Sequence, residues 1–325
     1  MKNFYHRSKT NQAPRRTSSY ARPQHPHPKV FRTTDEAESL FLAGVPVDPS
    51  PRIRLEDGCQ ELTMRAMDLI CPIGMGQRGL IVAPPGSGKT TILKHICQAV
   101  SKSAPGVKIY CLLIDERPEE VTDFRRSVTA EVRWSSSDQS YDHHVATADE
   151  LMRQAMLEAG KGENVMVLID SLTRLSRVHN AERRSSGRTL SGGVDARALE
   201  VPRRIFGSAR KIENGGSLSI LATILIETGS RMDEVIFEEF KGTGNMEVVL
   251  SREIANRRIF PAIDISKSAT RKEELLLLPD EREQISKIRR VLAGLNPVEA
   301  MQSLVEQLEK YPTNNELLAA VRGRA

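Results

Sequence analysis

Five apolar runs alternate with segments of helical periodicity, and this alternation constrains the fold more than any other feature of the chain. The runs are apolar on both faces, and such strands, when helices separate them, form a mostly parallel sheet that helices cover on both sides. We therefore predict an α/β fold with strands at 79–83, 108–115, 164–170, 217–226 and 245–251. Helices are predicted at 90–100, 118–128, 147–160 and 194–212, and from Lys272 onward.

The first 32 residues differ from the rest in charge. They carry eight Lys and Arg residues and no Asp or Glu, in a chain whose net charge is +5. They also contain four prolines and show almost no apolar periodicity, which predicts a disordered basic arm. Two interpretations stay open: a solvating tail, and an arm that binds phosphate groups.

Composition also bears on the compartment. The longest uninterrupted apolar stretches are far shorter than the roughly 20 residues of a membrane helix, and no signal peptide precedes them. The four cysteines show no C-x-x-C pairing, so we expect neither a cysteine metal site nor disulfides. We predict a cytoplasmic protein without a membrane partner.

The first chemical motif is APPGSGKTT, between the strand at 79–83 and the following helix. It departs from G-x-x-x-x-G-K-[ST] at Ala83 but keeps Gly88, Lys89 and Thr90 in place. Backbone N–H groups and a helix N-terminus can surround phosphate oxygens, Lys89 can reach the β- and γ-phosphates, and Thr90 can hold Mg²⁺. The predicted ligands are therefore ATP and Mg²⁺.

Two acids end neighbouring strands and are candidates for the hydrolytic machinery. Asp170 ends the run NVMVLID and is predicted to orient the metal ion. Glu116 follows KIYCLLID and is predicted to act as general base toward water. The segment DERPEE also has the features of a helix N-terminus, because Pro118 precedes Glu119 and Glu120. That explanation accounts for the last two acids but not for Glu116.

With these motifs in place, the chain resembles the Rho family of transcription termination factors, which are RecA-like hexameric ATPases. The resemblance runs from about Arg52 to about Glu299 and includes PIGMGQRGLIVAPP, LLIDERPEEV, SGGVDARAL and RRIFPAIDI. It implies a RecA-like P-loop core with a helical C-terminal part. It also implies a homo-hexamer that acts on single-stranded RNA, with RNA polymerase as a further candidate partner.

The resemblance also implies roles in the ATP site. Phe260 would stack on adenine, Arg117 would sense the γ-phosphate, and Arg258 and Arg271 would reach the site from the adjoining subunit. Arg258 as a solvated charge and Phe260 as a core residue remain alternatives. Gly86 departs from the family, which commonly has Lys there. The implied nucleotide contacts are Gly74, Met75, Gly76, Gln77, Arg78, Gly79, Gly86, Ser87, Gly88, Lys89, Thr90, Thr91, Arg117 and Phe260.

Two loops are implied to grip RNA in the centre of the ring. SSGRTLSGGVD, at 185–195, is small and polar, and taken alone it could be a surface linker. Ser186 and Arg188 match the family's RNA-contacting positions, and Arg231 in ETGSRMDE matches a second loop. Relatives commonly have Lys at both arginine positions, so the charge is kept while the donor geometry changes.

Family members usually carry an oligonucleotide-binding barrel upstream of the motor. Residues 33–78 are too few for its five strands, so we expect this barrel to be absent. The predicted organisation is a basic arm at 1–32, a short linker and helix at 33–50, and a RecA-like motor domain at 51–325. Its predicted function is ATP-dependent, RNA-directed translocation in transcription termination. The alternatives are a ring ATPase acting on another polymer, and a nucleotide-gated RNA-binding ring with slow hydrolysis.

Overall fold

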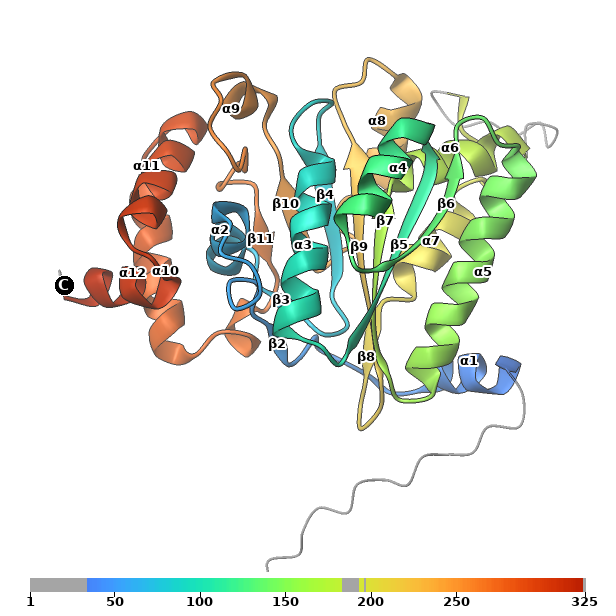
Figure 1. Cartoon of the computed structure of the whole chain (residues 1–325), viewed down its shortest axis with the longest axis horizontal. Coiled ribbons are helices and arrows are strands. Elements are labelled where there is room, and N and C mark those ends of the chain that lie inside the picture. The colour runs from blue at the N-terminus through green and yellow to red at the C-terminus, as the bar shows by residue number, and fades with distance from the viewer. Residues whose placement is uncertain (1–33, 183–192, 196, 324–325) are drawn as a thin grey trace, which may run out of the picture. The chain divides into compact units, whose positions relative to one another are not determined.

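A mixed sheet forms the centre of the fold (Figure 1). The computed structural model describes residues 34–182, 193–195 and 197–323. The sheet has the order β11-β10-β4-β9-β7-β5-β6, with β8 antiparallel to β9, β1 antiparallel to β8, and β2 and β3 in a separate small sheet. The strands are β1 Pro46–Val47, β2 Arg52–Ile53, β3 Ile73–Gly74, β4 Arg78–Ala83, β5 Val107–Glu116, β6 Glu131–Ser136, β7 Asn164–Asp170, β8 Arg210–Ile212, β9 Ser217–Leu225, β10 Met246–Val249 and β11 Ala269–Thr270.

Helices cover both faces of this sheet (Figure 1). They are α1 Thr34–Ala43, α2 Leu62–Ile70, α3 Lys89–Ser103, α4 Pro118–Ser127, α5 Tyr141–Gly160, α6 Leu172–Glu182, α7 Glu200–Gly207, α8 Arg231–Phe240, α9 Arg252–Asn256, α10 Pro279–Leu292, α11 Pro297–Lys310 and α12 Asn314–Arg322. In the described part of the chain, no helix combines the length and the apolar character needed to cross a bilayer.

Alternation of side chains along the central strands builds two cores. In β7, Met166 and Leu168 join the core that also contains α3, α4 and the C-terminal helices. Val167 and Ile169 point to the opposite face, into the core formed with α5, α6 and α8. Because both faces are buried, the strands are apolar at nearly every position. The predicted α/β class with a mostly parallel sheet is confirmed.

The five predicted strands correspond to β4, β5, β7, β9 and β10, and the predicted helical part beyond Lys272 contains α10, α11 and α12. The helix predicted at 194–212 is wrong at both ends, because α7 spans only Glu200–Gly207 and Arg210–Ile212 form β8. The reason is tertiary: β8 finds a ladder partner in β9, with Arg210 opposite Leu218. The pattern also missed β6, whose first four residues are exposed or only partly buried.

The segment before residue 51, where the motor domain is predicted to begin, packs against the central sheet and its helices. The predicted linker and helix span 33–50, and the described part of this segment includes α1 and β1. Phe41 of α1 is 2% exposed within the core on the α5 face, and β1 pairs with β8. These residues therefore contribute to the hydrophobic core.

The turn after β2 packs closely against α3, and a substitution in this turn can test the contact. A Cβ added at Gly58 would lie 1.9 Å from the backbone oxygen of Ala99. We therefore expect Gly58→Ala to lower the free energy of unfolding by about 2–3 kcal/mol, as overpacked core positions do. At exposed Gly106 an added Cβ meets no atom within 4 Å, so Gly106→Ala is the matched control and should change stability by about 0.5 kcal/mol at most. Urea unfolding of both variants measures the difference.

Candidate nucleotide-binding site

The site lies where parallel strands end. β4, β9, β7 and β5 are neighbours in that order and run in the same direction, so their carboxyl ends share one edge of the sheet. The phosphate loop follows β4, Glu116 ends β5, and Asp170 ends β7. Ligands of open α/β sheets bind at this edge, and the predicted convergence of Lys89, Glu116 and Asp170 occurs there.

The phosphate loop has the backbone of an anion cradle. Gly86 has φ of +77° and Gly88 has φ of +98°, a region that favours glycine. An added Cβ would meet no atom within 4 Å at either position, so the space in front of the loop is open. The Ser87 hydroxyl donates to the Pro84 carbonyl at 2.7 Å, which closes the loop before α3 begins at Lys89. Thr90 and Thr91 continue the first turn of α3, whose N-terminus faces this space with its positive dipole end.

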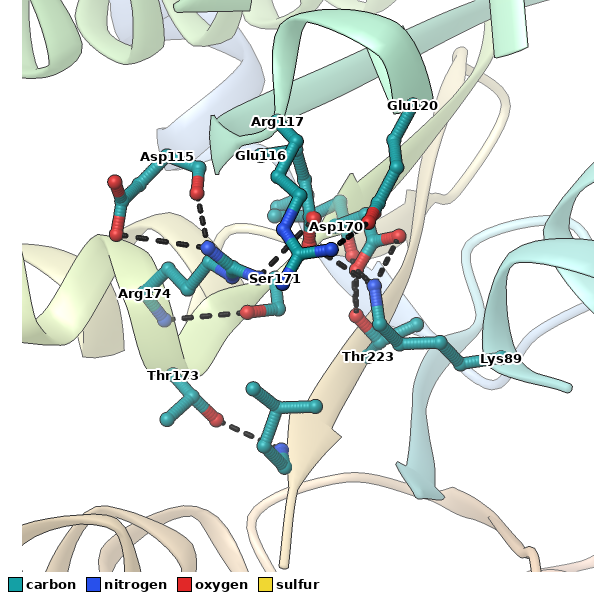
Figure 2. A network of polar contacts seen from close by, with 12 residues as sticks. Lys89, Asp115, Glu116, Arg117, Glu120, Asp170, Ser171, Thr173, Arg174 and Thr223 are labelled. Atoms are coloured by element: carbon teal, nitrogen blue, oxygen red, sulfur yellow. Dashed lines mark hydrogen bonds and ion pairs between the residues drawn. The ribbon is translucent and has the colours of Figure 1, made fainter. Parts of the chain in front are cut away.

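Lys89 joins the two predicted acids (Figure 2). Its Nζ donates to Asp170 Oδ1 at 2.7 Å and to Glu116 Oε1 at 2.9 Å. Burial would lower the pKa of Lys89, but the carboxylates of Asp170 and Glu116 outweigh it, so the pKa lies above its usual value. Lys89 is therefore held as a cation where phosphate charge would arrive.

Glu116 has the electrostatics of a base poised near neutrality. Its burial and the charge of Asp170 raise its pKa to about 7, while Lys89 and Arg174 act in the lowering direction. Within the described residues, its Oε2 is buried and accepts no hydrogen bond, although an Arg174 nitrogen lies 3.2 Å away as an ion pair. This oxygen therefore keeps acceptor capacity that no described residue uses.

The structure adds Arg174, which the sequence patterns did not single out. It lies on the first turns of α6, donates to the backbone carbonyl of Asp115, and pairs with both Asp115 and Glu116 (Figure 2). Arg174 therefore holds the end of β5 and orients the Glu116 carboxylate. No motif marks Arg174, because its partner lies 58 positions earlier and only the fold brings them together.

Two threonines also support the site without a sequence signal. The Thr223 hydroxyl on β9 donates to Asp170 Oδ1 at 2.7 Å. The Thr173 hydroxyl accepts from the backbone N–H of Leu225 at 2.8 Å, tying α6 to the end of β9. The Asp170 carboxylate therefore accepts hydrogen bonds from both Lys89 and Thr223.

Other predicted residues lie around this edge. Arg117 caps α4 directly after Glu116, and its exposed side chain lies 3.9 Å from Glu120. Phe260 is 47% exposed and lines a cavity of about 540 Å³ together with Arg258, which has φ of +62°. They follow β10, the strand beside β4. Phe260 is thus not a buried core residue, and Arg258 is exposed.

The structure does not bring two predicted groups to the phosphate loop of the same chain. The segment Gly74–Gly79 leads into β4 and includes its first two residues, whereas the phosphate loop follows β4, so most of the strand, roughly 15 Å, separates them. Arg271 follows β11, whose Thr270 pairs with Met246 at the start of β10, and its guanidinium donates to the Gly242 carbonyl at 3.3 Å. Both groups lie at the amino-terminal edge of the sheet.

Of the predicted RNA contacts, Arg231 lies within the described residues and Ser186 and Arg188 do not. Arg231 is exposed and begins α8 after the loop that follows β9. Asn180 of α6 donates to the Gly193 carbonyl at 3.1 Å and accepts from the Asp195 N–H at 2.7 Å. The last residues of the predicted pore loop are therefore hydrogen-bonded to the helix that carries Arg174.

Comparison with known proteins agrees with this geometry. Residues 63–270 match the model of the ATP synthase alpha/beta family, nucleotide-binding domain. The chain is 48% identical over 298 residues to transcription termination factor Rho of Haemophilus influenzae, covering 91% of this chain and 70% of that protein. It is 51% identical over 276 residues to the Mycobacterium bovis protein of the same name, covering 85% of this chain and 46% of that protein. The chain thus spans less than half of the mycobacterial relative.

Solved structures share the fold at low identity. An ATPase of a bacterial type III secretion system superposes with a TM-score of 0.68 at 22% identity, over 85% of each chain. The assembled ATPase EscN of enteropathogenic E. coli gives a TM-score of 0.70 at 22% identity, over 87% of this chain and 74% of that one.

Fold and phosphate site together define an ATP-hydrolysing P-loop enzyme with a RecA-like core. The chain belongs to the Rho family of transcription termination factors.

The role of Arg174 can be tested through pH. Because its charge lowers the pKa of Glu116, Arg174→Ala should raise that pKa above about 7. A base must be ionised to accept a proton, so the acidic limb of kcat/KM for ATP should move to higher pH, with a larger loss at pH 6.5 than at pH 8.5. Arg174→Lys keeps the charge and should retain part of the wild-type profile. An acidic limb that stays in place in Arg174→Ala would show that Arg174 does not act through Glu116.

Proposed function

We propose that this chain is an ATP-driven, RNA-directed translocase and helicase of the Rho type that acts in transcription termination as a homo-hexamer. The observation that carries the proposal is the convergence of Lys89, Glu116 and Asp170 in a chain about half identical to named termination factors. The secretion ATPases are 22% identical to this chain and resemble it in fold alone. A ring ATPase that acts on another polymer therefore has less support.

In this proposal the buried ion cluster rearranges when ATP binds. Lys89 leaves its carboxylate partners for the β- and γ-phosphates, while backbone N–H groups of Gly86–Lys89 surround the phosphate oxygens. Once Lys89 no longer contacts Glu116, the carboxylate can accept a proton from the water that attacks the γ-phosphate. Arg117 lies next to Glu116 in the chain and is the proposed γ-phosphate sensor.

Magnesium fits the oxygen groups at this edge. Carboxylate and hydroxyl oxygens are ligands that Mg²⁺ accepts, and it commonly binds through one or two protein groups plus substrate phosphates. Asp170 and Thr90 are the proposed holders, and the ion would neutralise charge on the transferred phosphoryl group. No cluster of three His, Cys, Asp or Glu side chains suited to a metal occurs in the described part of the chain, so the phosphates would complete the site.

The position of Arg271 supports a role for assembly. It lies at the opposite edge of the sheet from its own phosphate loop, so it can contact a nucleotide only on another subunit. Arg78 and Arg210 lie near it, and burial followed by the charges of Arg210 and Arg271 lowers the pKa of Arg78. An anionic group from a neighbour would relieve this repulsion. We propose that Arg258, which follows β10 and lies around the carboxyl edge, also contacts a nucleotide on the adjoining subunit.

Helix α6 supplies a physical link from the nucleotide to the RNA loops. Its first turns hold Arg174 beside Glu116, and its middle holds Arg177, which pairs with Asp233 of α8 behind the loop of Arg231. Its last turn holds Asn180, bonded to Gly193 and Asp195. A shift of α6 on hydrolysis would therefore move both proposed RNA-contacting loops together. We propose that Ser186, Arg188 and Arg231 contact single-stranded RNA.

The proposed motor predicts that ATP hydrolysis depends on RNA. Steady-state ATPase should rise at least about tenfold with single-stranded RNA and much less with single-stranded DNA. Arg231→Ala should lose most of this stimulation while keeping its RNA-free rate, because Arg231 lies outside the nucleotide site. Lys89→Ala should lose ATP binding, whereas Glu116→Gln should bind ATP but hydrolyse it about 10²-fold more slowly or worse. Equal rates with and without RNA would favour a nucleotide-gated binding ring instead.

Assembly can be tested by mixing variants. Arg271→Ala should lower turnover by about 10³ to 10⁵, as loss of an arginine acting in trans does. Rings mixed from Arg271→Ala and Glu116→Gln should regain activity, because some interfaces then combine an intact Glu116 with an intact Arg271. Lys272→Ala is the matched control, since Lys272 pairs with Asp48 at 2.9 Å on its own chain. Absence of recovery in properly mixed rings would place Arg271 outside the neighbouring site.

A further inference from the structure

The far edge of the sheet carries an aromatic side chain that the ATP site does not use. β6 is the last strand in the sheet order, and Figure 1 shows it between α4 and α5. Trp134 on β6 is the single tryptophan of the chain and is 38% exposed. The guanidinium of Arg125 on α4 lies 3.8 Å from the centre of its ring system. This stack holds the indole in place from one side and adds a positive charge.

A cavity of about 380 Å³ adjoins Trp134. One wall comes from α5, where His143, Thr147 and Glu150 are four and three residues apart and so share one helix face. Buried Leu151 provides an apolar surface on the same helix, and Gln139 lines the cavity from the turn that follows β6. The volume is within the range of small-ligand sites.

The polar groups around the cavity suit hydrogen bonds to a flat heterocycle. The Gln139 amide can donate and accept, and the Glu150 carboxylate can accept from an exocyclic amino group. His143 Nδ1 lies 2.6 Å from the Ser135 hydroxyl, which fixes the orientation of the imidazole. Arg133 also lines the cavity, but Glu131 pairs with it at 2.8 Å. The charge of Arg133 is thus largely compensated, so the site is better suited to a base than to a phosphate group.

We propose that this cavity binds an unpaired nucleobase, stacked on Trp134 and recognised at its edge by Gln139 and Glu150. An exposed tryptophan beside an arginine is the stacking platform that single-strand-binding proteins use, and every base offers a face to it. The base could belong to a strand of RNA or to a free nucleotide. The pocket consists of residues outside the ATP site, so binding of a free nucleotide does not depend on the proposed function. Binding of an RNA strand rests on that function.

Because Trp134 is the only tryptophan, its intrinsic fluorescence reports on this cavity alone. We expect saturable quenching when the full chain is titrated with oligo(C), oligo(U) or oligo(A) RNA in the absence of ATP. Gln139→Ala and Glu150→Ala should each raise the apparent Kd by about fivefold or more. Asp149→Asn is the matched control, because Asp149 is exposed beside Glu150 but does not line the cavity, and it should leave the Kd unchanged.

A second measurement does not need the fluorophore. Anisotropy of labelled single-stranded RNA should show binding about tenfold weaker for Trp134→Leu, the loss expected for one stacked base. Trp134→Phe retains an aromatic face and should recover most of the affinity. RNA-free ATPase and the melting temperature identify any variant that fails to fold, and the Gln139 and Glu150 variants then decide the question.

Titration of the Trp134 fluorescence with cytidine and adenosine monophosphates distinguishes a base in an RNA strand from a free nucleotide. Quenching by the monophosphates as well as by RNA indicates a general nucleobase pocket, and quenching by RNA alone indicates capture of a strand. Quenching that persists in Lys89→Ala excludes a signal from the phosphate loop. No saturable quenching by any of these ligands, or quenching that the Gln139 and Glu150 variants leave unchanged, would overturn the proposal. If RNA stimulates the ATPase but does not quench Trp134 fluorescence, the nucleobase pocket is rejected and the proposed motor is retained. If RNA quenches the fluorescence but does not stimulate the ATPase, the proposed motor is rejected and the pocket is retained.

Discussion

The contact of Lys89 with Asp170 and Glu116 is the interaction on which the rest of the site depends. Three charged side chains are largely buried at one sheet edge, and each alone would be costly to remove from water. Together they compensate one another, and Thr223 and Arg174 satisfy further positions on the carboxylates. The proposed phosphate-binding cation, Lys89, and the proposed base, Glu116, contact each other directly. Binding of phosphate to Lys89 would therefore change the surroundings of Glu116.

The parallel sheet makes that cluster possible. Since β4, β7 and β5 run in the same direction, the residues that end them meet without any sequence proximity. Two cores, one on each face, fix the strand positions through alternating side chains. Helix α6 then leaves the same edge and contacts α8 and the last residues of the proposed pore loop. Contacts of α6 thus connect Glu116 at the candidate nucleotide site with Asp233 of α8 and with Gly193.

The two ends of the strands divide the proposed functions between subunits. The carboxyl edge carries the groups proposed to bind and hydrolyse ATP, and the amino-terminal edge carries Arg78, Arg210 and Arg271. Burial, and after it the like charges of Arg210 and Arg271, lower the pKa of Arg78, so its charge is unfavourable in an isolated chain. This repulsion is a physical reason for a partner to supply negative charge at that edge. The turn Gly74–Gly79 includes Arg78, so a contact of this turn with nucleotide would also have to be made across an interface.

The sequence by itself determined the fold class, the phosphate loop and the two acids, because each depends on local pattern. Apolar runs, glycine positions and strand-ending carboxylates are visible within a few neighbouring residues. Tertiary structure alone decided that Arg174 and Thr223 complete the site, that 210–212 form a strand, and that Arg271 lies away from its own ATP site. It also placed Trp134 beside Arg125 and a cavity. These features depend on pairing between distant segments, and residue periodicity along one segment carries no information about its partner.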